Sequence, residues 1–324
     1  MSGTSALRTW WAQRPPAAGA AVLATGVLSV GLHLTGYEIL SRIALALAGV
    51  CWLGFAADFA VRLLRERERW AAEARSPDSL TAVAATTVLG TRLSDLGWQP
   101  LAEALLALAV ALWLGLVYPV VRRWRRGMPG TVFLGCVAME GIAVLGAVLA
   151  AAVGVAWLAH LALVFFWFGL VFYLAGLCCF GPRQVATGAG DQWIAVGGLA
   201  ISALAGARLL AAAHSGLYLW NDDDNGVLRT ATIGLLVLAS ACVCVLAAAE
   251  LRWPRPRYDV RRWATVYPLG MTSAAALSVA TALGVPWLRG PGRVLLWIAV
   301  AAWCAVLAGA ARPALGTVRS RAPR

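Results

Sequence analysis

The sequence predicts an all-α integral membrane protein, with ten transmembrane helices that form five helical hairpins. Three observations predict this class. Of the 324 residues, 61% are hydrophobic and only 13% are charged, which is far too apolar for a soluble domain of this length. The apolar residues fall into ten runs, most of them near the roughly 20 residues that cross a 30 Å hydrocarbon core. These runs alternate between glycine-rich, polar sequences and mostly apolar ones.

The first run follows a short polar segment, residues 1–14, which we place in the cytoplasm. Pro15 and Pro16 open the run, and proline is well tolerated in the first turn of a helix. No clear small-residue cleavage site follows, so we interpret the run as a retained helix. The predicted spans are 15–36, 39–61, 79–96, 100–121, 131–153, 156–179, 192–213, 228–249, 263–284 and 293–311. The transport domain therefore covers residues 15–311, and residues 312–324 form a basic cytoplasmic tail.

The odd-numbered spans carry the glycine, proline and polar residues. Even-numbered spans are mostly alanine, leucine, valine and aromatic residues, as in LALVFFWF at 161–168. The simplest packing places the five polar helices in an inner ring around a central pore and the five apolar helices outside them. Small residues let inner helices approach closely. The alternative is that the glycines serve tight packing only, with no conduit.

The ninth span, residues 263–284, gives the strongest indication of a pore. Pro268 and Gly270 interrupt it near its start, and hydroxyl side chains are spread along it. Irregular backbone at membrane depth is tolerated where it packs in protein or lines a water-filled cavity. We therefore expect a pore-lining helix with the bulky Tyr267 beside the break. The candidate pore and gate residues from the odd-numbered spans are Thr25, Ser29, Thr87, Gly90, Glu140, Gly198, Ser202, Tyr267, Pro268, Gly270 and Thr272.

The arginines set the orientation. All 27 basic residues are arginine, and 21 of them fall on the cytoplasmic side if the N-terminus is placed there. The positive-inside rule then puts both termini in the cytoplasm of a multi-pass protein of the cell membrane. Arg92 and Arg208 lie toward the outer ends of polar spans, where they would attract anions to the mouth of the pore. Snorkelling of these two side chains to the interface is the alternative.

Several functional classes are excluded or disfavoured by composition. The chain has no lysine, which rules out a Walker-type phosphate loop and Schiff-base chemistry. Its seven cysteines lie inside apolar runs and match no metal or redox spacing. We expect no metal, no cofactor, no catalytic residue and no nucleic-acid partner. The cluster at 122–126 is more simply explained as a contact with anionic lipid of the bilayer.

Glu140 lies near the middle of the fifth span, where an ionised carboxylate is costly and has the wrong sign for an anion path. It is either protonated and couples protons to transport, or paired with an arginine, or directed away from the path. An intramembrane enzyme that uses Glu140 with His33, His160 or His214 is the competing hypothesis. A non-conducting membrane sensor or scaffold is a third.

The segment Tyr267-Pro268-Leu269-Gly270-Met271, four residues after Trp263, resembles the W-x-x-x-F-P-x-G/T-M segment of the tellurite-resistance/dicarboxylate transporter family. Residues 24–29, 79–91 and 191–194 add to the resemblance, which covers nearly the whole chain. It implies a five-fold pseudo-symmetric bundle, a homotrimer and a central pore for tellurite, sulfite, dicarboxylates such as malate, or chloride and nitrate. It also implies a gate at Tyr267, where the family has a pore-plugging phenylalanine. A tyrosine has the size to plug a pore, but its hydroxyl needs a partner when buried. The alternative is an ordinary core aromatic beside a proline.

Overall fold

The computed structural model describes residues 19–187, 190–214, 222–253 and 260–319. Within these ranges the chain is helical and forms no β-strand, so the predicted all-α class is confirmed. The α-helices are α2 (Gly19–Leu34), α3 (Glu38–Arg65), α4 (Arg67–Glu73), α5 (Thr81–Asp95), α6 (Gln99–Val121), α7 (Leu134–Val153), α8 (Ala156–Cys179), α9 (Gln184–Thr187), α10 (Ile194–His214), α11 (Asp222–Arg252), α12 (Trp263–Ala282) and α13 (Arg289–Arg319). Short 3₁₀ helices precede five of them: η2 (Pro77–Leu80), η3 (Gly130–Phe133), η4 (Asp191–Trp193), η5 (Val260–Arg262) and η6 (Pro286–Leu288).

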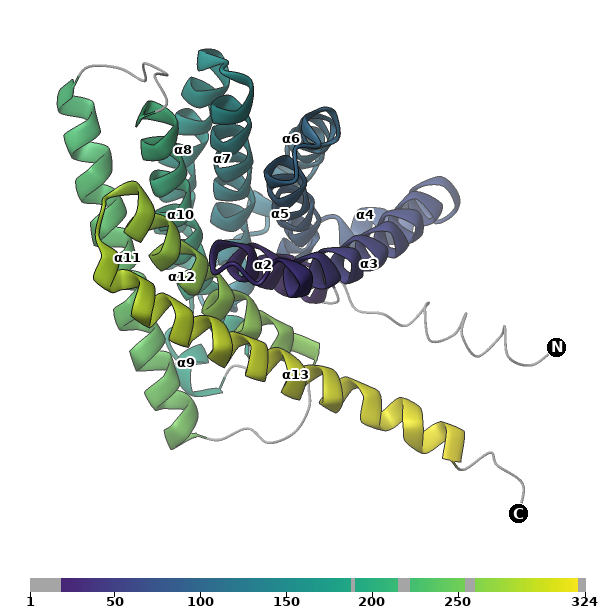
Figure 1. Cartoon of the computed structure of the whole chain (residues 1–324). Helices are drawn as coiled ribbons and strands as arrows, with labels where there is room; N and C mark the ends of the chain where they lie inside the picture. Colours follow the sequence, from purple (N-terminus) through teal and green to yellow (C-terminus); the bar gives the residue numbers. More distant parts are fainter. Residues whose placement is uncertain (1–18, 188–189, 215–221, 254–259, 320–324) are drawn as a thin grey trace.

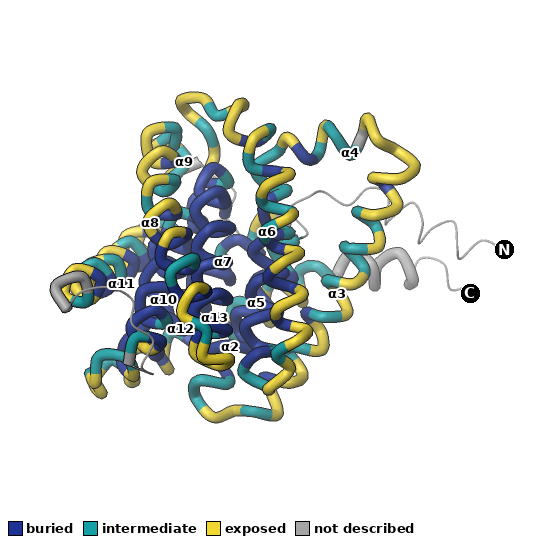
Figure 2. Tube along the Cα trace, turned by 90° about the horizontal axis from the view of Figure 1, so that it is seen from above, coloured by how far each residue is buried: buried dark blue, intermediate teal, exposed yellow. Residues whose placement is uncertain are grey.

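Five helices form a closed inner ring. Helix α2 packs on α5, α5 on α7, α7 on α10 and α10 on α12, and α12 returns to pack on α2. Figure 2 shows these helices in the buried centre of the molecule. The apolar window of the α7 segment is 94% buried and that of the α10 segment 83% buried, against 11% for α3. Small residues make the close approaches possible: at Gly90 of α5, an added Cβ would lie 2.6 Å from Leu145 of α7.

The helices α3, α6, α8, α11 and α13 lie outside this ring (Figures 1 and 2). Each packs on the inner helix that precedes it in the chain and also contacts the next inner helix around the ring. Their outward faces carry exposed apolar side chains such as Leu53 at 62%, Leu174 at 62% and Val237 at 63%. An apolar surface of this kind suits contact with lipid rather than water.

The five inner helices begin at the same end of the molecule. Gly19 of α2 abuts Thr81, the first residue of α5. The amide of Gly130, ahead of α7, donates to Oδ2 of Asp191, ahead of α10, at 3.2 Å. The backbone at Gly190 abuts that of Arg261 in η5, the short helix that directly precedes α12. The inner helices are therefore parallel to one another.

Seven helices in the described ranges are long and apolar enough to cross a membrane, namely α3, α6, α8, α11 and the segments that contain α7, α10 and α13. Helix α2, with 16 residues, is a shorter apolar helix. The prediction of transmembrane helices is confirmed at this level.

Several helix boundaries differ from the prediction, among them the following three. Helix α3 continues beyond residue 61 to Arg65, because Arg62 pairs with Asp58 one turn earlier, at 2.8 Å. Helix α11 begins at Asp222 rather than near 228, as acidic residues favour the first turn of a helix. Helix α13 continues to Arg319, through most of the predicted tail. The predicted segment 1–14 lies outside the described residues.

Candidate functional site

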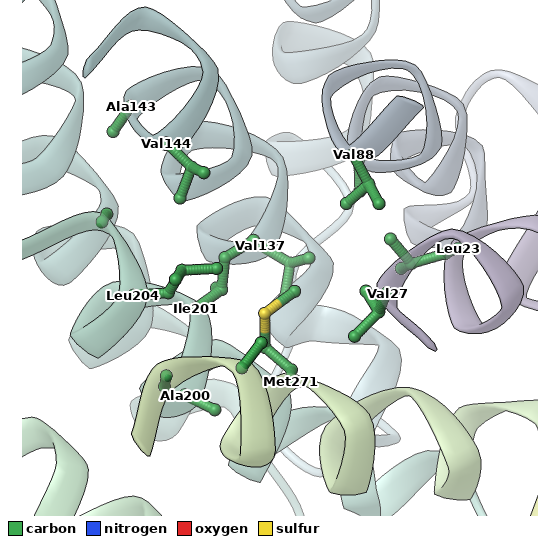
Figure 3. Close-up of a cluster of buried hydrophobic side chains, with 14 of the residues drawn as sticks. Leu23, Val27, Val88, Val137, Ala143, Val144, Ala200, Ile201, Leu204 and Met271 are labelled. Atoms are coloured by element: carbon green, nitrogen blue, oxygen red, sulfur yellow. The ribbon is translucent and has the colours of Figure 1, made fainter. Parts of the chain in front are cut away.

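The axis of the inner ring is closed by apolar side chains. A void of about 10 Å³ remains on it, which is the lower limit for one water molecule. All five inner helices line this void, through residues that include Val27, Thr87, Gly141, Ile201 and Met271. Figure 3 shows aliphatic side chains and the thioether of Met271 directed toward one another here. An ion cannot pass this point unless these side chains move, since nothing replaces its hydration shell.

Of the candidate residues in the third and ninth spans, Thr87 lines the void. Its hydroxyl donates to the carbonyl of Ala84 in its own helix, at 2.9 Å. Gly270 allows α12 to approach α2, because an added Cβ would lie 3.1 Å from Val27. Thr272 donates to the carbonyl of Pro268, at 2.7 Å, and α12 runs through Pro268 and Gly270 as one continuous helix, without the break that the sequence predicts there.

Thr25 and Ser29 of α2 bond to outer helices. The indole Nε1 of Trp303 in α13 donates to Oγ1 of Thr25, at 2.9 Å. Ser29 and Ser41 of α3 each donate to the other's backbone carbonyl, both at 2.7 Å. This reciprocal pair joins the two helices of the first hairpin and satisfies both buried hydroxyls.

Tyr267 lies one helical turn before Met271 on α12 and is 1% exposed. Its hydroxyl donates to the backbone carbonyl of Gly197 in α10, at 3.2 Å. The ring packs so closely on Gly197 that an added Cβ there would clash with it. The hydroxyl therefore has the partner that a buried tyrosine needs.

Glu140 is directed at the outer helix α8. An added Cβ at Gly169 of α8 would lie 2.5 Å from Oε1 of the carboxyl group. Oε1 accepts from the Ser202 hydroxyl at 2.9 Å, while Oε2 is buried and has no hydrogen-bond partner among the described residues. Nearby, Gly198 gives the ring of Tyr173 room to approach α10. The Glu140 carboxyl group therefore lies away from the axial void. It has no arginine partner among the described side chains.

Arg92 is fully buried near the end of α5. Its Nη2 donates to Oε1 of Glu38 at 2.7 Å and its Nε to the Ser41 hydroxyl at 3.0 Å. Glu38 also contacts Nδ1 of His33 at 2.8 Å and Nε of Arg42 at 3.1 Å. Arg92 therefore belongs to an ionic cluster that joins α2, α3 and α5. Arg92 Nη1 is buried, and the structure describes no partner for it.

Arg208, one turn or more before the end of α10, differs from Arg92. Two of its nitrogens, Nε and Nη2, are buried without a hydrogen-bond partner in the described ranges. A guanidinium group with unused buried donors is a natural ligand for an anion. The histidines do not converge on Glu140: His33 bonds to Glu38, His160 Nδ1 lies 2.8 Å from the Ala156 carbonyl, and the side chain of His214 is outside the described part.

Sequence reasoning missed most of the residues that close the axis. They are aliphatic side chains such as Val88, Val144 and Leu204, together with Met271. The residues predicted for the pore are mainly polar residues and glycines of the odd-numbered spans. An aliphatic residue that faces the axis has the same sequence pattern as one in any helix contact, so no signal in the sequence would have found these.

The fold and this axis define a class: helical membrane proteins with an inner ring of parallel helices closed by apolar side chains. The chain belongs to the voltage-dependent anion channel family (SLAC1), whose family model matches residues 13–311. This result confirms the resemblance drawn from the segment around Tyr267. The chain is also similar to uncharacterized membrane proteins from two strains of Mycobacterium tuberculosis, with 27% identity over 128 residues in each case. The match covers 38% of this chain and 63% of each relative.

Proposed function

We propose that the protein passes small anions across the cell membrane along the axis of its inner ring. The observation that carries this proposal is the closed ring of five parallel helices around one axis, in a chain that belongs to an anion-channel family. In the proposed topology all ten long helices cross the membrane as five hairpins, with both termini in the cytoplasm. Three copies assemble as a homotrimer, each with its own pore.

The proposed gate has two layers. The apolar side chains around the axial void form a constriction that excludes water, and hence ions, until it widens. Tyr267 lies one turn away on the same helix as Met271, so a rigid shift of α12 moves both side chains together. The Tyr267–Gly197 hydrogen bond stabilises the closed position.

The substrates we propose are small inorganic and organic anions: chloride, nitrate, sulfite, tellurite or a dicarboxylate such as malate. Two Arg208 nitrogens, Nε and Nη2, have no hydrogen-bond partner among the described residues, which supports an anion-attracting role for that residue. Arg92 has less positive charge to offer, since Glu38 pairs with it. We infer that Arg208 contributes more than Arg92 to the potential at the mouth.

Glu140 could couple the movement of protons to the passage of anions. Its carboxyl group has one hydroxyl partner at membrane depth, an expensive position for a charge. Protonation would remove that cost, and Ser202 connects the carboxyl group to the ring helix α10. If passage requires a proton, Glu140 is the residue that we expect to carry it.

The test is anion flux into proteoliposomes under an imposed membrane potential, for chloride, nitrate, sulfite, tellurite and malate. Ile201→Ala and Tyr267→Ala remove bulk at the constriction and beside it, and we expect a severalfold increase in flux. Val237→Ala, at a 63% exposed site on α11, is the matched control and should leave flux unchanged. A requirement for a pH gradient that disappears in Glu140→Gln would identify a proton-coupled carrier.

No flux of any of these anions in any of the folded variants would contradict the transport proposal. An intramembrane enzyme or a non-conducting sensor would then be the better explanation of the fold. The enzyme has little support from the described side chains, because His33 and His160 each bond elsewhere and do not meet Glu140.

A further inference from the structure

A second, larger cavity lies away from the ring axis. It is a cleft of about 300 Å³ that is lined by residues of α2, α3, α4, η2, α5 and α6. Figure 2 shows α3 and α4 standing apart from the body of the molecule on the side of α6. Leu108 of α6, at 39% exposure, lies in the lining, so the cleft reaches the apolar outer surface. Its volume is at the lower end of the range for small-molecule sites.

Four aromatic side chains form much of the wall: Trp52, Phe55, Phe59 and Trp70. Trp52 is held in place because its Nε1 donates to the Thr86 hydroxyl, at 2.9 Å. The rings of Phe59 and Trp70 meet edge to face, with centroids 5.7 Å apart. Aromatic faces gathered in this way attract cations that carry alkyl groups, such as quaternary ammonium groups.

The charged groups at the cleft favour the same kind of ligand. Its lining contains three carboxylates, Asp58, Glu73 and Asp78, and one guanidinium group, that of Arg62. Arg62 binds Asp58 at 2.8 Å and Glu73 at 2.7 Å, so its single charge is divided between two acids.

Asp78 has two further charged neighbours, Asp191 and Arg261. Burial raises the pKa of the Asp78 carboxyl group above its ordinary value. Among the residues that line the cleft, the two carboxylates of Asp58 and Glu73 outnumber the one guanidinium group, that of Arg62, even with Asp78 protonated.

We propose that this cleft binds an amphipathic ammonium compound, with its cationic head among the aromatic rings and carboxylates and its alkyl body along α6. The ligand would enter from the bilayer, where such molecules accumulate. A phospholipid fits less well, because its phosphate would face the carboxylates and two acyl chains exceed the volume. The cleft uses the outer sides of α2 and α5, is separate from the axial void, and does not depend on anion passage.

The experiment measures binding of radiolabelled decyltrimethylammonium to the full-length protein in an uncharged maltoside detergent. We expect one saturable site per chain. Unlabelled decyltrimethylammonium should displace the label, and decyl sulfate, with the same chain and the opposite charge, should not.

Phe59→Leu keeps an apolar side chain and removes a π face, and should weaken binding about tenfold. Asp58→Asn should weaken it through the lost charge. Trp287→Leu, at a 71% exposed tryptophan outside the cleft, is the control and should bind as wild type does.

Equal displacement by decyl sulfate would overturn the proposal, because the cleft would then recognise only the alkyl chain. Unchanged binding in both Phe59→Leu and Asp58→Asn would also overturn it. Displacement by short-chain phosphatidylethanolamine as effective as that by the ammonium compound would make a lipid headgroup the occupant instead. Thermal unfolding midpoints of all variants show whether a loss of binding comes from unfolding. The comparison with decyl sulfate uses only the wild-type protein, so it does not depend on the folding of any variant.

Discussion

Replacing Arg92 by alanine should destabilise the protein far more than replacing Arg42, although both arginines bind the same carboxylate. Arg92 is fully buried and donates to Glu38 and Ser41, at 2.7 and 3.0 Å. Arg42 bonds to Glu38 at 3.1 Å, but its side chain is 66% exposed. Breaking a buried ion pair typically costs about 3–5 kcal/mol, whereas an exposed pair contributes about 0–1 kcal/mol. Because the Glu38 side chain is 36% exposed, water screens this pair in part, and we expect a cost of about 2–3 kcal/mol for Arg92→Ala.

The measurement is thermal unfolding in detergent at one fixed scan rate, followed by tryptophan fluorescence. At roughly 2 °C per kcal/mol, the Arg92→Ala midpoint should fall by about 4–6 °C and the Arg42→Ala midpoint by no more than about 2 °C. Arg92→Lys should lie between them, because an ammonium group reaches Glu38 but lacks the fork that also binds Ser41. Equal shifts for Arg92→Ala and Arg42→Ala would refute the view that this buried cluster holds α2, α3 and α5 together.

Two further predictions concern α10. Gly206→Ala should destabilise the protein by about 1–3 kcal/mol, because the new Cβ would clash with Thr232 of α11. The control, Gly234→Ala, lies in open space on α11 and should be neutral or slightly stabilising. Equal effects of the two changes in thermal unfolding would contradict the contact between Gly206 and Thr232. Arg208→Gln should lower anion flux at low salt and reduce the dependence of flux on ionic strength, because the attracting charge is gone. The control is the same change at the exposed Arg42. An unchanged salt dependence in Arg208→Gln would rule out attraction of anions by Arg208.

The order and the approximate limits of the helices could be predicted from the sequence. Apolar run length and the alternation of polar with apolar runs depend on local composition, which the bilayer constrains directly. Boundaries were less predictable where charged side chains prolong a helix into water. Asp58 and Arg62 stabilise the last turns of α3 in this way, and no hydropathy pattern records such a pair.

The directions of the side chains could not be predicted. An inner helix has polar residues both toward the axis and toward its hairpin partner, and the sequence does not state how the helix is rotated about its own axis. Thr25 and Ser29 contact outer helices, while Thr87 lines the axial void. The partner of the Tyr267 hydroxyl is a backbone carbonyl 70 residues away on another helix. A contact of that kind depends on tertiary packing alone.

The parallel arrangement of the inner helices makes the two ends of the axis electrostatically unequal. Each helix has a macrodipole equivalent to roughly half a positive charge at its N-terminus and half a negative charge at its C-terminus. Five such dipoles point the same way around one axis, so they add, whereas in an antiparallel bundle they would cancel. In the proposed topology the positive end faces the cytoplasm, where Asp78 and Asp191 offset part of its potential. A pore of this form is intrinsically polarised, and its current–voltage relation should rectify even between identical salt solutions.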